Sequence, residues 1–490
     1  MTTLSESRRN WVTTRRDLLI GGRAVEAAGR QWSVTNPATG HVLGQVAGAS
    51  LDQVDQAVAA ARAAFPAWAA LTGDERSRWL HHLADVLAAS ADDLVASIVN
   101  EIGTPVSMAA SLQVGLPIEE HVRWAAEAAK RDRTVELGPY DLPHPTMSDV
   151  VYEPAGVVAA VTAYNYPLSL ATFKFGAALA SGCTVVLLPS PRAPLSSLLI
   201  ADLVEQAGLP DGVFNVILGL EDVGVRLTSH PGVDRVSFTG SDAVGASIMA
   251  QAATRLTPVT LELGGKSPTI VMPDVDLDDV VGQVHRRWSR NGGQGCAALA
   301  RLLVHRSRYD EFLEKSGAAF DEIVVGDPWD PRTTVGPMID AAHRARVEGF
   351  VSEAVGLGAT VAASSHEELP EAGWFTRAVL LDQVTPEFRV VREEVFGPVA
   401  VMLPFVDEDD AVRLANDSEY GLAANVWCAD PVQARRMAGR IRAGTVWING
   451  GGGMRPDAPF GGYGRSGVGR ELGEWGMHEF LEPKHIQWRI

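Results

Sequence analysis

The segment Asn291-Gly-Gly-Gln-Gly-Cys296-Ala297 places a single cysteine in a glycine-rich loop, directly after an amphipathic segment that ends near Arg290. Glycines in this stretch let the backbone approach a bound ligand closely, because no side chain obstructs it. They also leave the backbone N–H of Cys296 free to donate a hydrogen bond. A lone cysteine is commonly a small buried apolar residue, so the loop alone does not establish a nucleophilic thiol.

Four further motifs accompany the cysteine loop, two upstream and two downstream. They are Thr162-Ala-Tyr-Asn165-Tyr-Pro167, Leu261-Glu262-Leu-Gly-Gly-Lys266, Glu394-Val-Phe396-Gly-Pro398 and Pro459-Phe-Gly-Gly-Tyr463. Together the segments resemble the aldehyde dehydrogenase superfamily, in the family's order and with its interval between Glu262 and Cys296. The resemblance runs from about Asn36 to Glu482 and implies an NAD(P)-dependent, non-acylating member.

The composition is that of a folded protein with more than one domain. The chain has 490 residues, of which 46% are hydrophobic and 21% charged. A formal net charge of −18 argues against nucleic acid or an anionic membrane as partner. The three cysteines are too scattered for a disulfide framework or a metal-ligand cluster, so we expect no metal and a reducing cytoplasm. Arg15-Arg16 resembles a twin-arginine export signal, but the apolar run after it is shorter than the roughly 7–15 residues required.

Alternating short β-rich and helical runs from Gly156 onward predict a parallel sheet covered by helices on both faces. A second α/β pattern runs from Ser267 to about Gly450. The resemblance implies an aldehyde dehydrogenase-like α/β fold with a Rossmann-type cofactor domain, an α/β catalytic domain and a small β oligomerisation arm. We expect the cofactor-binding domain at 1–130 and 152–260, the catalytic domain at 261–475, and the arm at 131–151 and 476–490.

Two further features concern the ends of the chain. Helical periodicity covers Leu51–Trp68 and Asp74–Asn100, with Ser50 and Asp74 as candidate N-caps. The arm is expected from alternating β-formers in 134–151 and a β-rich tail in 478–489. In the family these segments add strands to a neighbouring subunit, which implies a homodimer or homotetramer. A surface hairpin within one chain is the alternative.

Resemblance and side-chain chemistry together give each catalytic function a candidate. Cys296 matches the nucleophile, which forms a thiohemiacetal and then a thioester. Asn165 matches the oxyanion donor that acts beside the Cys296 N–H, although it is also a plausible turn residue before Pro167. Glu262 matches the general base, and burial in its apolar run should raise its pKa; a structural ion pair is the alternative. Lys174 matches a lysine near the nicotinamide that relays protons, or is an exposed structural lysine.

These residues predict oxidation of an aldehyde to its carboxylic acid with NAD(P). Family members that pass the acyl group to coenzyme A typically lack the base, so Glu262 favours hydrolysis of the thioester. Three alternatives stay open. The first is a semialdehyde dehydrogenase that anchors a carboxylate with Arg290. The second is a catalytically silent homologue that serves as a binding or structural protein, and the third is a thioesterase or esterase that needs no cofactor.

The expected cofactor site uses a strand-to-helix turn and a second loop. Phe238-Thr-Gly240-Ser241 matches the family's turn, where backbone N–H groups and the helix N-terminus suit a pyrophosphate. Glu394 and Phe396 match the pair that holds the nicotinamide ribose and packs its ring; in isolation they also read as a plain turn. The other expected cofactor-binding residues are Thr162, Ser190 and Leu263.

The strand end Leu188-Pro-Ser190-Pro191 departs from the family pattern. Members usually carry a lysine in place of Leu188, and NAD-preferring members a glutamate in place of Pro191; both hold the adenosine ribose hydroxyls. Each loss should weaken cofactor binding about 10- to 100-fold. NAD is the expected cofactor, with NADP as the rival, because a 2′-phosphate meets no acid in this stretch and Arg192 can pair with it.

The expected substrate pocket is an apolar tunnel with at most one cation. It is lined by Tyr166, Leu170, Phe173 and Phe460, and it takes a small-molecule aldehyde. Arg290 stands where many members have an aromatic residue and where semialdehyde-oxidising members often have arginine. Those members usually add a second arginine at the position of Phe173. A solvent-facing or acid-paired Arg290 is the alternative.

Overall fold

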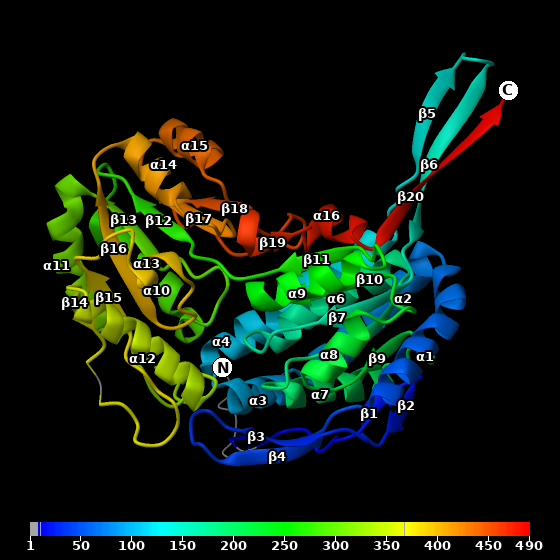
Figure 1. Ribbon diagram of the computed structural model, residues 1–490, viewed down its shortest axis with the longest axis horizontal. Coiled ribbons are helices and arrows are strands. Elements are labelled where there is room, and N and C mark those ends of the chain that lie inside the picture. Colours follow the sequence, from blue (N-terminus) through cyan, green and yellow to red (C-terminus); the bar gives the residue numbers. More distant parts are fainter. Residues whose placement is uncertain (1–7, 10, 367) are drawn as a thin grey trace.

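The computed structural model describes residues 8–9, 11–366 and 368–490 and shows two α/β bodies with a projecting arm (Figure 1). The first body holds an eight-stranded sheet. Its order is β19 (Gly467–Val468), β11 (Val259–Glu262), β10 (Arg235–Thr239), β7 (Val157–Val161), β8 (Thr184–Leu188), β9 (Phe214–Val216), β1 (Leu18–Ile20) and β2 (Arg23–Val25). The strands from β11 to β9 are parallel, as predicted. Strand order reverses at β7, so the ends of β7 and β10 flank a crevice suited to a ligand.

Helices cover both faces of this sheet because its strands are apolar on both faces. Val158 and Ala160 join a core with α6 (Pro167–Ser181) and α7 (Pro194–Gln206). The alternate residues Val157 and Ala159 join a second core with α1 (Leu51–Ala69) and α8 (Glu221–Thr228). This division follows from the period of two along a strand. It confirms the parallel sheet with helices on both faces that the alternation of β-rich and helical runs predicted.

The first helices show one confirmed cap and one wrong cap. Ser50 caps α1 and forms a capping box with Gln53. Asp74 does not cap α2 (Gly73–Ala89), because Thr72 accepts the Glu75 N–H and the Glu75 side chain bonds back to Thr72, a reciprocal pair that Asp74 cannot form. The predicted second helix is also divided, since α3 (Ala91–Ile102) starts after Ser90. Within the described residues, no helix is long and apolar enough to cross a membrane.

The second body holds a seven-stranded sheet. Its order is β14 (Thr360–Ser364), β15 (Val379–Asp382), β16 (Val399–Phe405), β13 (Arg301–His305), β12 (Pro268–Val271), β17 (Ala423–Trp427) and β18 (Thr445–Ile448), and only β14 runs antiparallel to its neighbour. The chain then returns to the first sheet, where β19 pairs with β11. The expected domain boundaries stay predictions, with β19 lying inside the segment 261–475.

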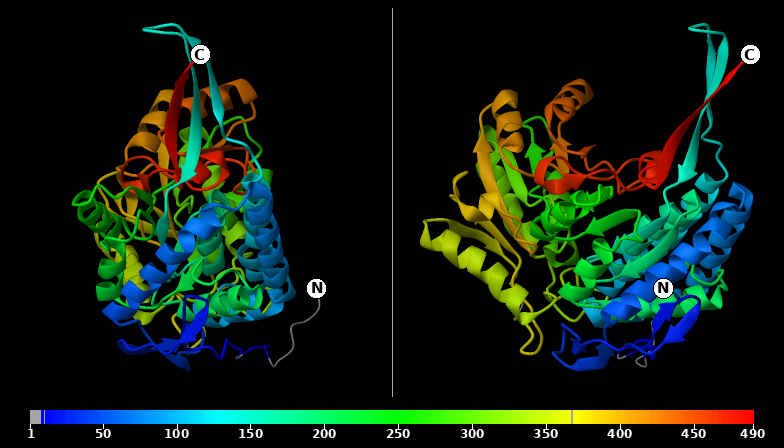
Figure 2. Two further views of the ribbon diagram at one scale, coloured as in Figure 1. Left: turned by 90° about the vertical axis from the view of Figure 1, so that its right-hand side faces the viewer. Right: turned by 45° about the vertical axis from the view of Figure 1, so that its right-hand side comes forward.

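The arm is a three-stranded antiparallel sheet that extends away from both bodies (Figures 1 and 2). Its order is β20 (Leu481–Arg489), β6 (Thr146–Pro154) and β5 (Val135–Tyr140). The C-terminal strand β20 therefore lies beside β6, which belongs to the segment that interrupts the first body. The β-rich tail was expected from residue 478, but the strand begins at Leu481. His478 is instead the last residue of α16 (Gly473–His478).

Candidate active site

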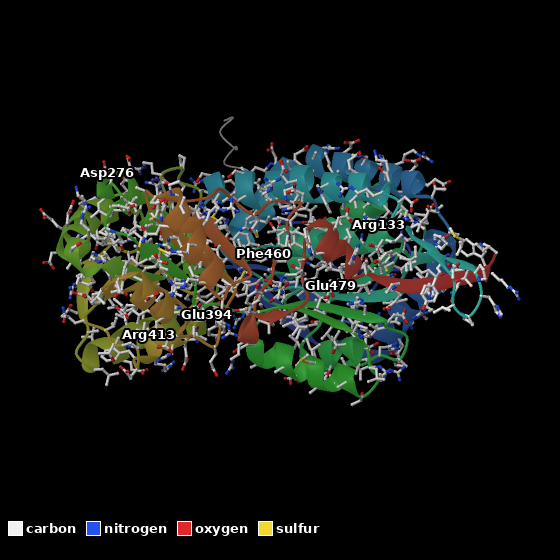
Figure 3. All side chains as sticks on the ribbon, turned by 90° about the horizontal axis from the view of Figure 1, so that it is seen from above. Arg133, Asp276, Glu394, Arg413, Phe460 and Glu479 are labelled. Atoms are coloured by element: carbon white, nitrogen blue, oxygen red, sulfur yellow. The ribbon has the colours of Figure 1, made fainter. Side chains whose placement is uncertain are left out.

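The site lies where the two bodies meet. Figure 3 shows Phe460 and Glu394 near the middle of the molecule, between Asp276 and Arg413 on one side and Arg133 on the other. Cys296 lies in the connection between α10 (Leu277–Ser289) and β13.

The cysteine loop has a left-handed backbone that glycine makes possible. Asn291, Gly292 and Gly293 have φ values of 54°, 61° and 68°. A Cβ atom on Gly293 would lie 2.1 Å from the carbonyl oxygen of Gly397. The close approach expected of this loop is therefore real, and it brings the loop against the segment that carries Phe396.

Gln294, which sequence reasoning passed over, connects the loop to its surroundings. The Tyr164 hydroxyl and the Ile339 N–H both donate to Gln294 Oε1, at 3.0 and 3.1 Å. The Gln294 amide donates to the Pro337 carbonyl at 3.1 Å. Asn165 Nδ2 donates to the Gln294 carbonyl at 2.9 Å. An amide nitrogen has two protons, so Asn165 keeps one donor for a ligand.

The backbone of Asn165 is also held in place by hydrogen bonds. Its carbonyl accepts hydrogen bonds from Asn291 Nδ2 at 3.0 Å and Gln113 Nε2 at 3.2 Å. Gln113 also donates to Thr104, whose hydroxyl donates to Asn291 Oδ1. This buried network holds the amide donor and the cysteine loop in one rigid unit.

The Cys296 thiol is half-buried, and its surroundings disfavour the thiolate. Burial raises its pKa well above the ordinary value, and the negative charges of Glu262 and Glu394 raise the pKa further. A protonated thiol is a weak nucleophile. Attack on a carbonyl therefore requires a group that takes the proton.

Glu262 stands at the end of β11 with 2% of its surface exposed. Burial raises its pKa well above the ordinary value, Glu471 raises the pKa further, and Lys174 and Arg470 oppose both effects. Its Oε1 has no hydrogen-bond partner in the described chain. An unpartnered buried carboxylate oxygen is costly, so a role in chemistry is favoured over the structural ion pair.

Lys174 is fully buried, so the alternative of an exposed lysine is wrong. Its Nζ lies 2.5 Å from Glu471 Oε1 and donates to Ser237 Oγ at 3.1 Å. Glu471 is the main residue that sequence reasoning missed. It lies in no recognisable pattern, and only folding brings it to Lys174 and Glu262.

The turn after β10 presents donors at the crevice. Ser241 caps α9 (Asp242–Ala253) by accepting the Val244 N–H, and a Cβ on Gly240 would lie 2.3 Å from the Phe238 ring. The Thr162 hydroxyl, after β7, is buried and lacks a partner among the residues described. Helix-terminal N–H groups and an unsatisfied hydroxyl fit a dinucleotide with a pyrophosphate.

The other expected cofactor residues line the same crevice or support it. Glu394 Oε1 accepts the Gly265 N–H at 3.0 Å, and burial raises the pKa of Glu394 to about 7. The Phe396 ring meets the Tyr164 ring edge-on at 6.0 Å. Ser190 accepts the Arg192 N–H at 3.3 Å, whereas Leu263 is buried against Gly245 of α9.

The end of β8 shows what replaces the missing ribose ligands. Leu188 is buried in the core beneath α8, and the Pro191 carbonyl accepts the Trp32 Nε1–H at 2.9 Å. Arg192 Nε lies 3.2 Å from Asp340 Oδ2, and its guanidinium stacks over the Tyr164 ring at 5.6 Å. An acid therefore does face this region. Sequence reasoning missed it because Asp340 comes from the second body.

The expected tunnel residues gather around the thiol. Leu170, Phe173 and Phe460 form a buried apolar cluster, against which Tyr166 and Cys296 pack. Leu422 and Leu472 are buried members that were not expected from the sequence, and Met454, Ala163 and Ala297 pack against the cluster. Arg290 is exposed, with no ion pair among the described residues, and its charge acts on the Tyr166 hydroxyl.

Residues 24–486 match the sequence model described as the aldehyde dehydrogenase family. The chain belongs to the aldehyde dehydrogenase family. The family assignment, the fold class and the enzyme class predicted from the sequence are thereby confirmed.

Members of the aldehyde dehydrogenase family resemble this chain over nearly its whole length. The geranial dehydrogenase of Castellaniella defragrans is 39% identical and covers 96% of this chain and 98% of its own. The chloroplastic aminoaldehyde dehydrogenase ALDH10A8 of Arabidopsis thaliana is 38% identical, with 92% of each chain covered. A solved variant of aldehyde dehydrogenase C from Pseudomonas syringae, in complex with NAD+ and octanal, superposes with a TM-score of 0.93 at 38% identity and 98% coverage of both chains.

Proposed function

We propose that this chain oxidises an aldehyde to its carboxylic acid with NAD, through a thiohemiacetal and a thioester on Cys296. The observation that carries the proposal is the meeting of two groups. A half-buried thiol that needs a proton acceptor lies within the field of Glu262, a buried carboxylate whose Oε1 has no hydrogen-bond partner from residues 8–9, 11–366 and 368–490.

In the first step the Cys296 sulfur bonds to the aldehyde carbon. The thiol proton leaves toward Glu262, and the carbonyl oxygen becomes an oxyanion. The free proton of the Asn165 amide and the Cys296 N–H donate to that oxygen. Both donors are fixed before the substrate arrives, because Asn165 is held by Gln294, Asn291 and Gln113.

In the last step water releases the product. Before this step Glu262 releases the thiol proton to solvent and is again a carboxylate. It then takes a proton from water as the oxygen bonds to the thioester carbon, and it returns this proton to the sulfur as the carbon–sulfur bond breaks, which frees the acid and the Cys296 thiol. The Lys174–Glu471 pair sets the charge beside Glu262 and offers protonatable groups that return Glu262 to its starting state.

The proposed cofactor is NAD, with NADP as the rival. The N-terminus of α9 with Ser241, the Thr162 hydroxyl, Glu394 and Phe396 would hold it. When bound, NAD accepts the hydride that converts the thiohemiacetal into the thioester. Support comes from solved relatives whose structures contain NAD+. Leu188 and Pro191 lack polar side chains for the ribose, so we expect weaker binding than in members with the lysine and glutamate.

The test measures NADH formation by the wild-type chain and by Cys296→Ala and Glu262→Gln variants. We expect turnover in the wild type and none in Cys296→Ala. Glu262→Gln loses the acceptor for both the thiol proton and the water proton, so we expect no steady-state turnover and a slowed single turnover, after which the acyl group is retained on Cys296 in the intact mass. Absence of wild-type turnover with saturating NAD and NADP would contradict the proposal and favour the silent homologue. Ester hydrolysis without nucleotide would reveal the cofactor-independent activity.

The proposed substrate is an aldehyde with an apolar chain, because Leu170, Phe173 and Phe460 surround the approach to Cys296. The names of a geranial dehydrogenase and of an octanal complex among the relatives support this class. A semialdehyde is the second candidate, favoured by the exposed Arg290, which has no ion pair in the part of the chain that the structure describes and whose charge acts on the Tyr166 hydroxyl. To separate the two substrate classes, we would measure kcat/KM of the wild type and of Arg290→Ala with octanal and with an ω-carboxylated aldehyde of equal length. If Arg290 binds the substrate carboxylate, Arg290→Ala should lower kcat/KM by about tenfold for the carboxylated aldehyde and leave kcat/KM for octanal unchanged.

The proposed quaternary state is a homodimer or homotetramer built through the arm, in a reducing cytoplasm where all three thiols stay free. In the three-stranded sheet, β5 and β20 are edge strands. Val135, Leu137 and Tyr140 on β5 and Trp488 on β20 are large apolar side chains exposed at 42–59% of their surface. Light scattering after Leu137→Lys and Trp488→Lys checks the proposal, which predicts loss of the oligomer.

A further inference from the structure

Arg192 is the only one of the residues just after β8 that reaches a charged group of the second body within the described chain. Its Nε lies 3.2 Å from Asp340 Oδ2, and its guanidinium covers the Tyr164 ring at 5.6 Å. Asp340 is the N-cap of α12 (Ala341–Gly356), where its side chain accepts the His343 N–H at 2.7 Å. The pair therefore joins the segment after β8 in the first body to the start of α12 in the second body.

The position of Arg192 is one at which dinucleotide folds recognise the cofactor. In doubly wound sheets the end of the second strand of the nucleotide unit, here β8, recognises the adenosine ribose, by an acid for NAD or by an arginine for a 2′-phosphate. The stacking ring of Tyr164 follows β7, at the point where strand order reverses. Arg192, which follows β8, thus holds its five-donor guanidinium over the ring that follows β7, the strand next to β8.

We propose that Arg192 binds a phosphate group of the dinucleotide, and that Asp340 is the anion that this phosphate displaces. The proposal rests on the cofactor proposed above. Guanidinium–phosphate pairs are charge-assisted and frequently bidentate. The side chains of Arg192 and Asp340 retain 47% and 32% of their exposure, so their ion pair is weak and can exchange partners. The Tyr164 ring keeps the guanidinium in place during the exchange.

The phosphate has two possible sources on the same ligand. The 2′-phosphate is present only in NADP, whereas the pyrophosphate is present in NAD as well. In either case Arg192 attracts the ligand and Asp340 repels it. The two partners of one ion pair therefore act on binding with opposite signs, which a purely structural bridge between the bodies cannot do.

The experiment measures equilibrium dissociation constants for NAD and NADP by calorimetry, on the full chain and without turnover. Arg192→Gln should weaken binding of NADP by about tenfold, and Asp340→Asn should strengthen it. Equal effects on NAD and NADP would assign the pyrophosphate, and effects confined to NADP would assign the 2′-phosphate. Arg192→Lys should fall between wild type and Arg192→Gln, since lysine keeps the charge and loses the fork.

Arg226→Gln is the matched control. It removes a different half-exposed ion pair of the first body, Arg226–Asp55, in which Nη2 lies 2.6 Å from Oδ2, and should leave both constants unchanged. Equal weakening by Arg192→Gln and Asp340→Asn would make the pair a structural bridge and overturn the proposal. So would unchanged binding in Arg192→Gln. If the wild type binds neither dinucleotide, the proposed cofactor itself fails.

Discussion

Two ion pairs beside the crevice differ in burial. Lys174 and Glu471 expose 0% and 4% of their side chains, whereas Arg192 and Asp340 expose 47% and 32%. Charges interact strongly in the buried pair because water does not screen them, and breaking such a pair leaves a bare charge in an apolar interior. The exposed pair contributes little to stability. We therefore expect fixed charges on the proposed catalytic side and charges that can change partners on the proposed cofactor side.

The largest expected effect breaks the buried pair. Glu471→Ala leaves the Lys174 ammonium without its counter-ion, and we expect the free energy of unfolding to fall by about 3–5 kcal/mol. Denaturant unfolding monitored by circular dichroism measures the loss. If the free energy of unfolding falls by less than about 1 kcal/mol, as expected for an exposed ion pair, Lys174 reaches water in the variant. The proposed difference between the buried and the exposed pair would then disappear.

Asn165→Ala tests whether the amide of Asn165, which the buried hydrogen-bond network holds in place, stabilises the oxyanion. Removal of one oxyanion donor should lower kcat by about 100- to 1,000-fold. Steady-state kinetics checks the rate, and the dissociation constant for NAD serves as the control because Asn165 acts on the substrate oxygen. A variant that loses NAD binding in proportion to kcat would instead identify Asn165 as a structural residue.

Gly293→Ala tests the backbone on which the thiol is placed. The left-handed φ of 68° and the nearby Gly397 carbonyl exclude a Cβ atom, so we expect destabilisation of about 1–3 kcal/mol and slower acylation. Gly317→Ala is the matched control, since a Cβ there meets no atom within 4 Å. Similar unfolding curves for the two variants would contradict the close approach.

Glu471→Gln sharpens the electrostatic half of the comparison. The pKa of Glu262 is raised by burial and then by the charge of Glu471, so loss of that charge lowers the pKa. Hydrolysis needs Glu262 as a carboxylate, which forms as pH rises through this pKa. The acidic limb of kcat against pH should therefore move to lower pH in the variant. Arg192 is not among the charges that shift the pKa of Glu262, so Arg192→Gln should leave the acidic limb of kcat at the same pH.

The smallest expected effect concerns stability on the exposed side. Arg192→Gln should change the free energy of unfolding by less than about 1 kcal/mol, because solvent screens the pair with Asp340. The same denaturation experiment measures it in the absence of nucleotide. A loss as large as that of Glu471→Ala would mean that the pair holds the two bodies together, and the contrast between the regions would disappear.

Local motifs and apolar runs were sufficient to predict much of this molecule. β7 and β8 belong to the alternating β-rich and helical runs predicted from Gly156 onward, and both strands are apolar because they are buried on both faces. Cap choice was less predictable: Asp74 and Thr72 are both good caps, and only the reciprocal bond with Glu75 decides between them.

By itself the sequence determined the family, the parallel sheets, the thiol, its glycine loop and the candidates Asn165 and Glu262, since each is encoded within a few neighbouring residues. Tertiary structure decided which charges act on them. Glu471 reaches Lys174 from 297 positions away in the chain, Asp340 reaches Arg192 from the other body, and Gln294 gains its role from partners on separate loops. Such contacts leave no local pattern, because burial and distance arise only when the chain is folded.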